Sequence, residues 1–435
     1  MNFADFLDLA PTLTGSPLAA GLRPVTAMSP ELARTALGPR TPHELSAGYA
    51  TSTATPITIA VLTRDEAEHI EACLTALVHD ADRILLIDSQ STDDTVARAR
   101  RVRPDVEVLT APWCDDFAHH RNLALQHITE GWVVFVDADE VLREQDAGSL
   151  RKALRALDHL LPSADLVVSP LIVDADGTGY SDNRRILRAS TRFRYRGRVH
   201  EKPYDREGQA PPRIHLATRF DHTGYTPEVM ERRSKRQRNA RLLELCRREE
   251  PDNATWVYYA VRDTTDFRAA GPERLRALFD ELRTAVERPL PDDSPEYLTE
   301  RNVDAWALLC RLAVGFGGSE EITEFAARLD GVGRHVEAAY FTALMESGRV
   351  LTRLSTLADR IAAAARWETV DSRHVMGQLF EIQATVALAS GRYDLVRPAL
   401  HAAAERGAGH GLHEDLALLR ELLSGLDGAV GSQSS

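Results

Sequence analysis

Four short strand-like runs constrain the fold of this chain more than any other feature. They occupy residues 57–62, 83–88, 106–109 and 132–136, and segments with helical periodicity separate them. Almost every position in these runs is apolar, which is typical of strands buried on both faces rather than of half-exposed strands. The order strand, helix, strand, helix therefore predicts an α/β domain with a mostly parallel sheet covered by helices on both faces.

Polar side chains follow the first three runs at the points where they end. Thr63-Arg64-Asp65-Glu66 follows the first run, Asp88 ends the second, and Arg121 lies beyond the third. Open parallel sheets bind ligands at the carboxyl ends of their strands, so we expect these groups to lie together. Asp88 can accept the imide N–H of a uracil ring, and Arg121 can stack on that ring or contact a phosphate. A helix-capping turn at Asp88 and an exposed helical arginine at 121 are the alternatives.

The fourth run ends in Asp137-Ala138-Asp139-Glu140. Residues two apart on a strand point to the same side, so the carboxylates of Asp137 and Asp139 can face one ligand together. Paired oxygen donors at an open strand end suit Mn²⁺ or Mg²⁺ that also takes phosphate oxygens. We therefore predict a metal site for a nucleotide diphosphate, with an acidic turn as the alternative. A second Asp-Ala-Asp, at 174–176, precedes Gly177-Thr178-Gly179 and predicts only a hairpin turn.

Together these segments resemble family 2 glycosyltransferases of the GT-A fold. The resemblance runs from Pro56 to about Tyr225 and is carried by residues 57–66, 85–95, 116–122 and 132–140. It implies an inverting transfer of a sugar from a nucleotide-diphosphate sugar, with UDP as the nucleotide. It also implies that the donor is bound by Thr63, Arg64, Glu66, Asp88, Arg121 and Asp137, and the metal by Asp137 and Asp139.

Three later segments resemble a subgroup of these enzymes. They are Tyr195–Glu201, Phe220–Tyr225 and Lys235–Glu244. The subgroup has a helical, often tetratricopeptide-like C-terminal region and includes sublancin-type peptide S-glycosyltransferases and lipopolysaccharide-core transferases. His222, in the second segment, is a candidate third metal ligand; a histidine satisfied within a turn is the alternative. A basic run, residues 184–202, is a candidate contact for the diphosphate or for an acidic acceptor.

An inverting transfer needs a base near the attacking group of the acceptor. Glu201 is the candidate, because it lies beyond the Asp-x-Asp and within a subgroup segment; Asp182 and Asp221 are its rivals. A cysteine thiol, with a reference pKa of about 8.5, would need a weaker base than an alcohol. The acceptor is open between a peptide, a glycan and a small molecule.

The chain is expected to divide into four parts. Residues 1–54 are rich in Ala, Pro, Thr, Ser and Gly and predict a loosely ordered extension. The glycosyltransferase domain covers 55–225, and residues 226–425 predict a tetratricopeptide-like or bundled helical domain for acceptor recognition or homodimerisation. Ser-Gly-Arg at 347–349 and again at 390–392 suggests repeated helical hairpins. A disordered tail is expected at 426–435.

Composition excludes several classes of protein. The net charge of −13 argues against general nucleic-acid binding. No apolar run approaches the roughly 18–20 residues of a membrane span, and a signal peptide is not expected. Four scattered cysteines, at 73, 114, 246 and 310, predict reduced thiols and a cytoplasmic protein.

Two other functions were weighed against sugar transfer. A non-catalytic, partner-binding helical-repeat protein on a degenerate GT-A domain would have no reason to keep Asp88, Arg121, Asp137 and Asp139 together. A nucleotidyltransferase would carry a Gly-rich basic loop after the first strand, whereas this chain has Thr63–Glu66. Glycosyl transfer is therefore the favoured function.

Overall fold

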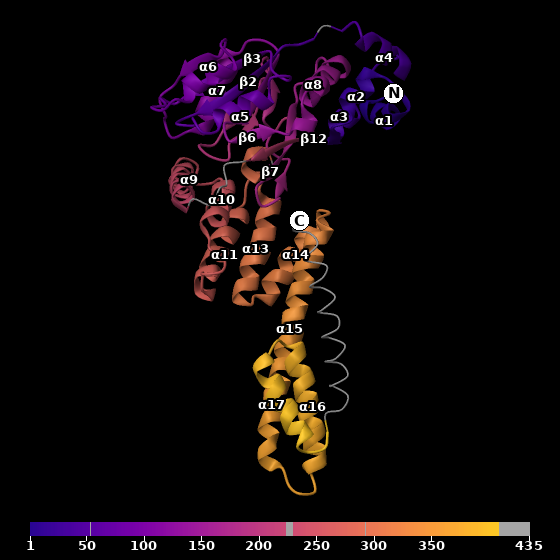
Figure 1. Ribbon diagram of the computed structural model, residues 1–435, viewed down its shortest axis with the longest axis vertical. Helices are drawn as coiled ribbons and strands as arrows, with labels where there is room; N and C mark the ends of the chain where they lie inside the picture. The colour runs from indigo at the N-terminus through magenta and orange to yellow at the C-terminus, as the bar shows by residue number, and fades with distance from the viewer. Residues whose placement is uncertain (53, 223–228, 292, 409–435) are drawn as a thin grey trace. The chain divides into compact units, whose positions relative to one another are not determined.

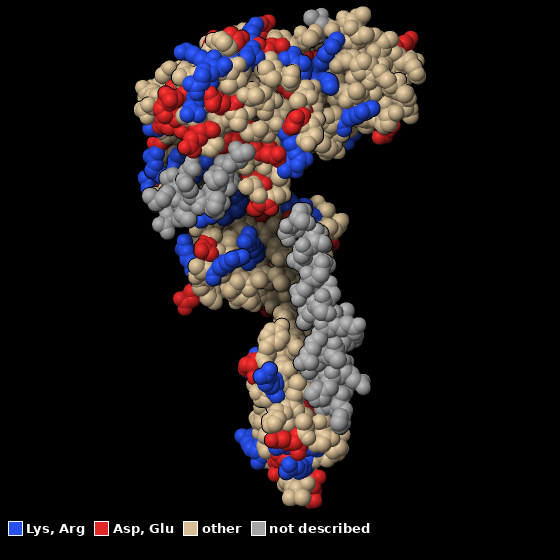
Figure 2. Space-filling model, in the orientation of Figure 1, with Lys and Arg blue, Asp and Glu red and all other residues tan. Residues whose placement is uncertain are grey.

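The computed structural model describes residues 1–52, 54–222, 229–291 and 293–408 (Figure 1). The chain divides into two compact units. The first contains Met1–Arg268 and Asp280–Ala305, and the second contains Ala269–Phe279 and the chain from Trp306 onward. On the face drawn in Figure 2, the acidic and basic side chains of the described residues are interspersed rather than gathered by sign.

A mixed sheet forms the centre of the first unit, which confirms the α/β class. Its strand order is β1-β12-β7-β9-β5-β2-β3-β4, with β6 paired to β12 and β8 to β7. The four predicted strands are parallel to one another, and β7 is parallel to β12; the remaining pairs are antiparallel. The strands of this sheet are β1 Val25–Met28, β2 Ile57–Thr63, β3 Arg83–Asp88, β4 Glu107–Thr110, β5 Trp132–Asp137, β6 Glu140–Leu142, β7 Val167–Asp174, β8 Gly179–Tyr180, β9 Ile186–Arg188 and β12 Arg213–His222. A separate pair is formed by β10 Arg194–Arg196 and β11 Lys202–Tyr204.

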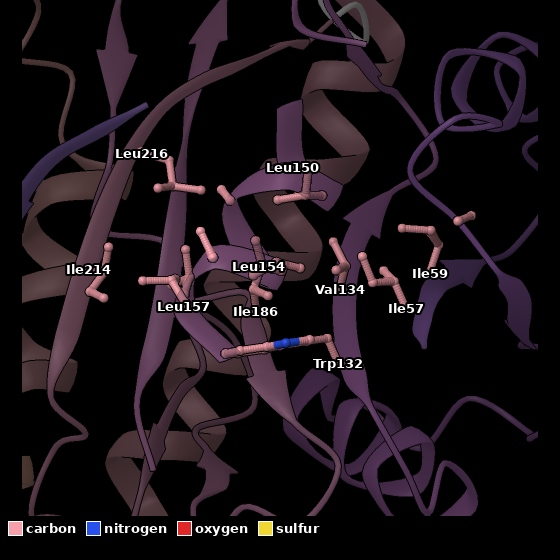
Figure 3. Packing of buried hydrophobic residues seen from close by; sticks show 14 of the residues in the cluster. Ile57, Ile59, Trp132, Val134, Leu150, Leu154, Leu157, Ile186, Ile214 and Leu216 are labelled. Carbon is pink, nitrogen blue, oxygen red and sulfur yellow. The ribbon is translucent and has the colours of Figure 1, made fainter. Parts of the chain in front are cut away.

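Helices cover both faces of this sheet, as the apolar strands predict. Successive side chains of a strand point to opposite faces. Ile59 and Val134 lie in a core with α5 Ile70–Ala76, α6 Thr95–Val102 and α8 Ser149–Leu160 (Figure 3). Their neighbours on the other face pack against α7 Phe117–His127.

The N-terminal segment differs from the expected loosely ordered extension. It forms α1 Phe3–Leu9, η1 Ala10–Thr12, α2 Pro17–Leu22, β1, α3 Pro30–Ala33 and α4 Pro42–Tyr49. Phe3, Phe6, Leu18 and Leu45 are buried in the same core as β2 and β5, and β1 pairs with β12. These helices and the strand are too short to show a clear hydrophobic periodicity in the sequence. Capping boxes at the starts of α1 and α4 stabilise these two helices.

Helices dominate after β12. They are α9 Val229–Glu249, α10 Ala254–Thr264, α11 Pro272–Val286, α12 Glu296–Thr299, α13 Asn302–Phe316, α14 Ser319–Gly331, α15 His335–Ala364, α16 Arg373–Ala389 and α17 Tyr393–Ala404; short 3-10 turns lie at η2 Glu144–Asp146 and η3 Ala365–Trp367. The first compact unit continues past the expected boundary at residue 225, so α9 and α10 belong to it. Residues 223–228, which hold that boundary, and 409–435, which hold the expected tail, lie outside the described residues. No described helix is long and apolar enough to cross a membrane.

One of the two expected inter-helix turns is present in the structure. Ser390-Gly391-Arg392 forms the turn between α16 and α17, with Gly391 at a φ of +75°. Ser347-Gly348-Arg349, in contrast, lies inside the continuous helix α15, so its prediction as an inter-helix turn was wrong. A single Gly in a helix interior costs only about 1 kcal/mol relative to Ala, which is too little to break a helix of 30 residues.

Candidate functional site

The parallel strands bring the predicted polar groups to one edge of the sheet. Thr63 pairs with Asp88 in the β2–β3 register, and Leu62 pairs with Asp137 in the β2–β5 register. The buried Asp88 carboxylate accepts hydrogen bonds from the Ser91 hydroxyl at 2.6 Å, the Ser91 amide at 3.1 Å and the Thr63 hydroxyl at 3.3 Å. Asp88 thus orders a turn, as its alternative interpretation requires, at the strand end where a ligand is expected.

The loops after β2 and β3 are held together by hydrogen bonds. Asp65, at a φ of +55°, accepts from the Thr92 amide at 2.7 Å, and the Glu66 amide donates to the Thr95 hydroxyl at 2.7 Å. Arg64 is exposed. Burial raises the pKa of Glu66, and the nearby negative charge of Asp139 raises it further, which places Glu66 close to the second aspartate of the Asp-x-Asp.

Arg121 is buried, which rules out the exposed helical arginine. It is only 4% exposed, and its Nε donates to Glu201 Oε1 at 2.6 Å while Nη2 donates to Asp137 Oδ1 at 3.4 Å. Its guanidinium lies over the rings of Phe135 and Tyr195, at 5.1 and 5.6 Å from their centroids. Within the described part of the chain, Nη1 has no hydrogen-bond partner. The two N–H groups of this Nη1 are therefore left for a ligand or a water.

Arg185 is a residue of this site that the sequence did not single out. Its Nη2 donates to Asp137 Oδ2 at 2.7 Å, and its Nη1 reaches both oxygens of Glu140 at 2.7 and 2.8 Å. Burial raises the pKa of Glu140 to about 7, against the opposing charge of Arg185. The basic run at 184–202 was the only signal for this residue. Both oxygens of Asp137 thus face arginines.

Asp139 faces His222 instead. Its Oδ2 lies 3.1 Å from His222 Nε2 and 3.2 Å from Lys235 Nζ. The β12 registers place His222 opposite Glu140 of β6 and Asp174 of β7, and its Nδ1 lies 2.8 Å from Asp174 Oδ1. The structure therefore brings together the predicted residues Asp139 and His222, although they lie far apart in the sequence.

Carboxylates face both ring nitrogens of His222. Burial opposes its protonation, but the hydrogen bonds to Asp139 and Asp174 raise the pKa of His222 to about 9. The pKa of Asp139 lies below its ordinary value because these hydrogen bonds and the charge of Lys235 outweigh burial. A histidine whose second ring nitrogen is held by a carboxylate has the arrangement of a metal ligand. The residues present therefore fit a divalent ion between Asp139 and His222.

The three candidate bases occupy different surroundings. Glu201 contacts Arg121, which reaches Asp137. Asp182 instead belongs to an ion cluster with Lys202, Arg184 and Glu300, and it is the second carboxylate partner of those cations. Asp221 points to Arg219 and Arg143, with its side chain 39% exposed. Among these three carboxylates, only Glu201 is linked to the Asp-x-Asp within the described residues by a single intervening side chain, that of Arg121.

The sequence also did not predict that Asp174 contacts His222. The predicted hairpin is present, because the Gly177 amide donates to the Asp174 carbonyl at 2.9 Å and Asp174 ends β7 before β8. The turn prediction described the backbone of 174–176 and gave no indication of the His222 contact, which depends on strand pairing far along the chain.

Known proteins resemble the part of the chain that carries this site. The model of "Glycosyl transferase family 2" matches residues 58–207. Glycosyltransferase SunS of Bacillus subtilis (strain 168) is 29% identical over 335 residues, 76% of each chain. A TPR repeat-containing protein of Synechococcus elongatus is 26% identical over 205 residues, 46% of this chain and 49% of that protein.

A solved structure was also matched at lower similarity. It is glucosyl-3-phosphoglycerate synthase from Mycobacterium tuberculosis in complex with Mn²⁺, UDP-glucose and phosphoglyceric acid, at 22% identity and a TM-score of 0.21. The match covers 31% of this chain and 48% of that one. The family model and the similarity to SunS lead to the same conclusion: residues 58–207 match the glycosyl transferase family 2 model, and the chain is a glycosyltransferase.

Proposed function

We propose that this enzyme transfers a sugar from a UDP-sugar to a peptide or another soluble acceptor, with inversion and with Mn²⁺ or Mg²⁺ at the Asp-x-Asp. The observation that carries the proposal is the pair Asp139–His222, 3.1 Å apart at the carboxyl edge of the sheet. It lies beside a second cluster in which Arg121 and Arg185 bind Asp137. Metal ligands next to fixed cations are what a diphosphate requires.

The chain's own residues would hold the leaving diphosphate. His222 is fixed by Asp174 through Nδ1, so that Nε2 faces Asp139. Lys235 reaches the same carboxylate, and Arg238 lies where the charges of Glu66, Asp137 and Asp139 act on it. Both cations come from α9. When bound, the divalent ion neutralises charge that grows on the leaving group.

The uridine would lie at the ends of β2 and β3. Asp88 already accepts hydrogen bonds from Ser91 and Thr63, but a carboxylate has about four lone-pair positions, so it can also accept the imide N–H of uracil. The planar face of Arg121 lies over protein rings, so we propose that it acts through its charge and its Nη1–H rather than by stacking on the base.

Glu201 is the proposed base. The Arg121 Nε donates to Glu201 Oε1 at 2.6 Å and so holds this carboxylate in place beside the Asp-x-Asp. A cysteine thiol, with a reference pKa of about 8.5, ionises more easily than an alcohol and demands less of the base. A thiol of a peptide is therefore the acceptor that we favour, and the similarity to glycosyltransferase SunS supports it. The attack would form the bond to the anomeric carbon as the bond to the diphosphate breaks.

The remaining expectations concern the setting of the enzyme. All four cysteines are free thiols in the structure, which supports our proposal of a reducing, cytoplasmic compartment. We propose that the helices of the second unit recognise the acceptor or a second copy of the chain. The helical hairpin α16–α17 supports a tetratricopeptide-like arrangement there.

Calorimetric titration with UDP, GDP and dTDP, with and without Mn²⁺, tests the donor proposal. Manganese-dependent binding of UDP should be lost in Asp139→Asn. Asp176→Asn is a matched control, because it alters the same position of the second Asp-Ala-Asp, in an exposed turn. If none of the three nucleotides binds to the wild type with or without Mn²⁺, the proposal of a UDP-sugar donor and a metal at the Asp-x-Asp fails.

A further inference from the structure

A cysteine and two histidines meet where the loop after β4 enters α7. The Cys114 Sγ and one ring nitrogen each of His119 and His120 lie within 4.8 Å of one another. Asp116 fixes this corner, because its side chain accepts from the His119 amide at 2.9 Å as the N-cap of α7. The backbone therefore presents the three side chains from one ordered turn.

His120 has no hydrogen-bonding account of its own. The residue is 1% exposed, yet neither ring nitrogen has a partner within the described part of the chain. Its ring packs edge-on against Trp113, at 5.2 Å between centroids, and against His119, at 5.5 Å. A buried unsatisfied polar group is rare in native proteins and often marks an ion or a water.

We propose that Cys114, His119 and His120 form a zinc site, distinct from the oxygen-rich site at Asp139. Thiolate and imidazole ligands favour Zn²⁺ over Mn²⁺ and Mg²⁺. Ligand atoms around a tetrahedral zinc ion lie roughly 3.3–3.8 Å apart, given the usual Zn–N and Zn–S distances. The cluster must therefore contract by about 1 Å, which the exposed side chains of Cys114 and His119 can do by rotation. A water would complete the coordination.

The position of this site suggests what the ion does. His120 directly precedes Arg121, and the amide of Phe117, at the start of α7, donates to the Arg198 carbonyl at 3.0 Å. Zinc bound here would join the loop after β4 to the first turn of α7. It would thereby fix the helix that carries Arg121. The proposed site does not depend on which sugar or acceptor the enzyme uses.

The test uses the full-length, untagged protein, with zinc measured by mass spectrometry and Co²⁺ as an optical probe. The wild type should retain about one zinc ion per chain after dialysis and show a thiolate-to-cobalt charge-transfer band. Cys114→Ser should abolish that band, and His119→Gln should weaken zinc binding about tenfold or more. Both residues are exposed, so both variants should fold. Zinc should raise the thermal midpoint of the wild type but not of these variants.

Two controls separate this site from other metal binding. His127→Gln alters an exposed histidine at the other end of α7 and should leave zinc binding unchanged. Asp139→Asn should abolish the manganese-dependent binding of UDP and leave the cobalt charge-transfer band unchanged. The proposal is overturned if the wild type holds no more zinc than Cys114→Ser, or if His127→Gln loses as much zinc as His119→Gln.

Discussion

Asp174 Oδ1 lies 2.8 Å from His222 Nδ1, so the end of β7 orients the histidine at the end of β12. This contact fixes the ring so that Nε2 faces Asp139, 3.1 Å away. An outer carboxylate of this kind sets the tautomer and raises the basicity of a ligating histidine.

Asp174→Asn should weaken manganese binding about 10- to 100-fold, because the amide holds the imidazole less firmly in its ligating form. Titration of Mn²⁺ in the presence of UDP measures the change. Asp176→Asn, two residues along the same hairpin, should bind manganese like the wild type. Equal affinity in the wild type and Asp174→Asn would show that Asp174 only shapes the turn.

Asp88→Asn should weaken the binding of UDP and dTDP about tenfold, because both pyrimidines present an imide N–H that an amide N–H₂ would repel. Calorimetry with both nucleotides at saturating Mn²⁺ measures the loss. The manganese requirement itself should persist. A variant that binds UDP normally would place the base away from β3.

Arg185→Gln should lower the free energy of unfolding by about 3 kcal/mol, because it leaves the buried Glu140 without its arginine partner, whereas the half-exposed Asp137 keeps Arg121. Urea denaturation measures this difference. The double variant Arg185→Gln, Glu140→Gln should recover part of the lost stability, because position 140 then carries a neutral amide instead of a buried, unpaired carboxylate. A double variant less stable than the single one would contradict this account of the ion pair.

Asp263→Asn should reduce stability at neutral pH and also reduce turnover. His200, at a φ of +54°, lies 2.5 Å from Asp263 and stacks on Tyr259 at 4.1 Å, and this arrangement fixes the adjacent Glu201. Burial alone would raise the pKa of Asp263, but the hydrogen bond and charge of His200 hold it below its ordinary value. The stabilisation that the Asp263 carboxylate contributes is therefore present above a pH of about 4. It is lost as the pH falls through the lowered pKa of Asp263 in the folded protein.

Unfolding at pH 7 and at pH 3 measures that contribution: the difference between wild type and Asp263→Asn should shrink at the lower pH. The exposed Asp266→Asn serves as the control and should match the wild type at both. A positioning role for Asp263 further predicts a fall in kcat with little change in the donor KM. A constant stability difference at both pH values would contradict the assigned ionisation.

Strand ends were the part of the site that the sequence predicts well. Asp88, Asp137 and Asp139 follow apolar strands directly, so local pattern and the topology of parallel sheets suffice to bring them together. Arg185 could not be singled out, because arginine is so frequent in this chain that one more carries little information. The role of Asp174 depends on the pairing of β7 with β12, which no local pattern reveals.

Errors in the predicted fold have a similar origin. Residues 1–54 have the composition of a flexible segment, yet Phe3 and Phe6 find a core that other segments provide. The helix α15 also runs through the exposed Ser347-Gly348-Arg349, where composition alone suggests a turn, because the cost of one Gly is small in a helix of 30 residues.

The pairing of β1 with β12 has a practical consequence for anyone who shortens this protein. β12 carries His222 at its end and is flanked by β7 on one side and by β1 on the other. A fragment cut to the family-matched residues 58–207 lacks both β1 and β12, so the unpaired backbone of β7 would become the sheet margin, and such margins recruit other chains. Expression of that fragment should yield aggregates rather than a minimal enzyme, because the family-matched segment leaves out two strands of the sheet.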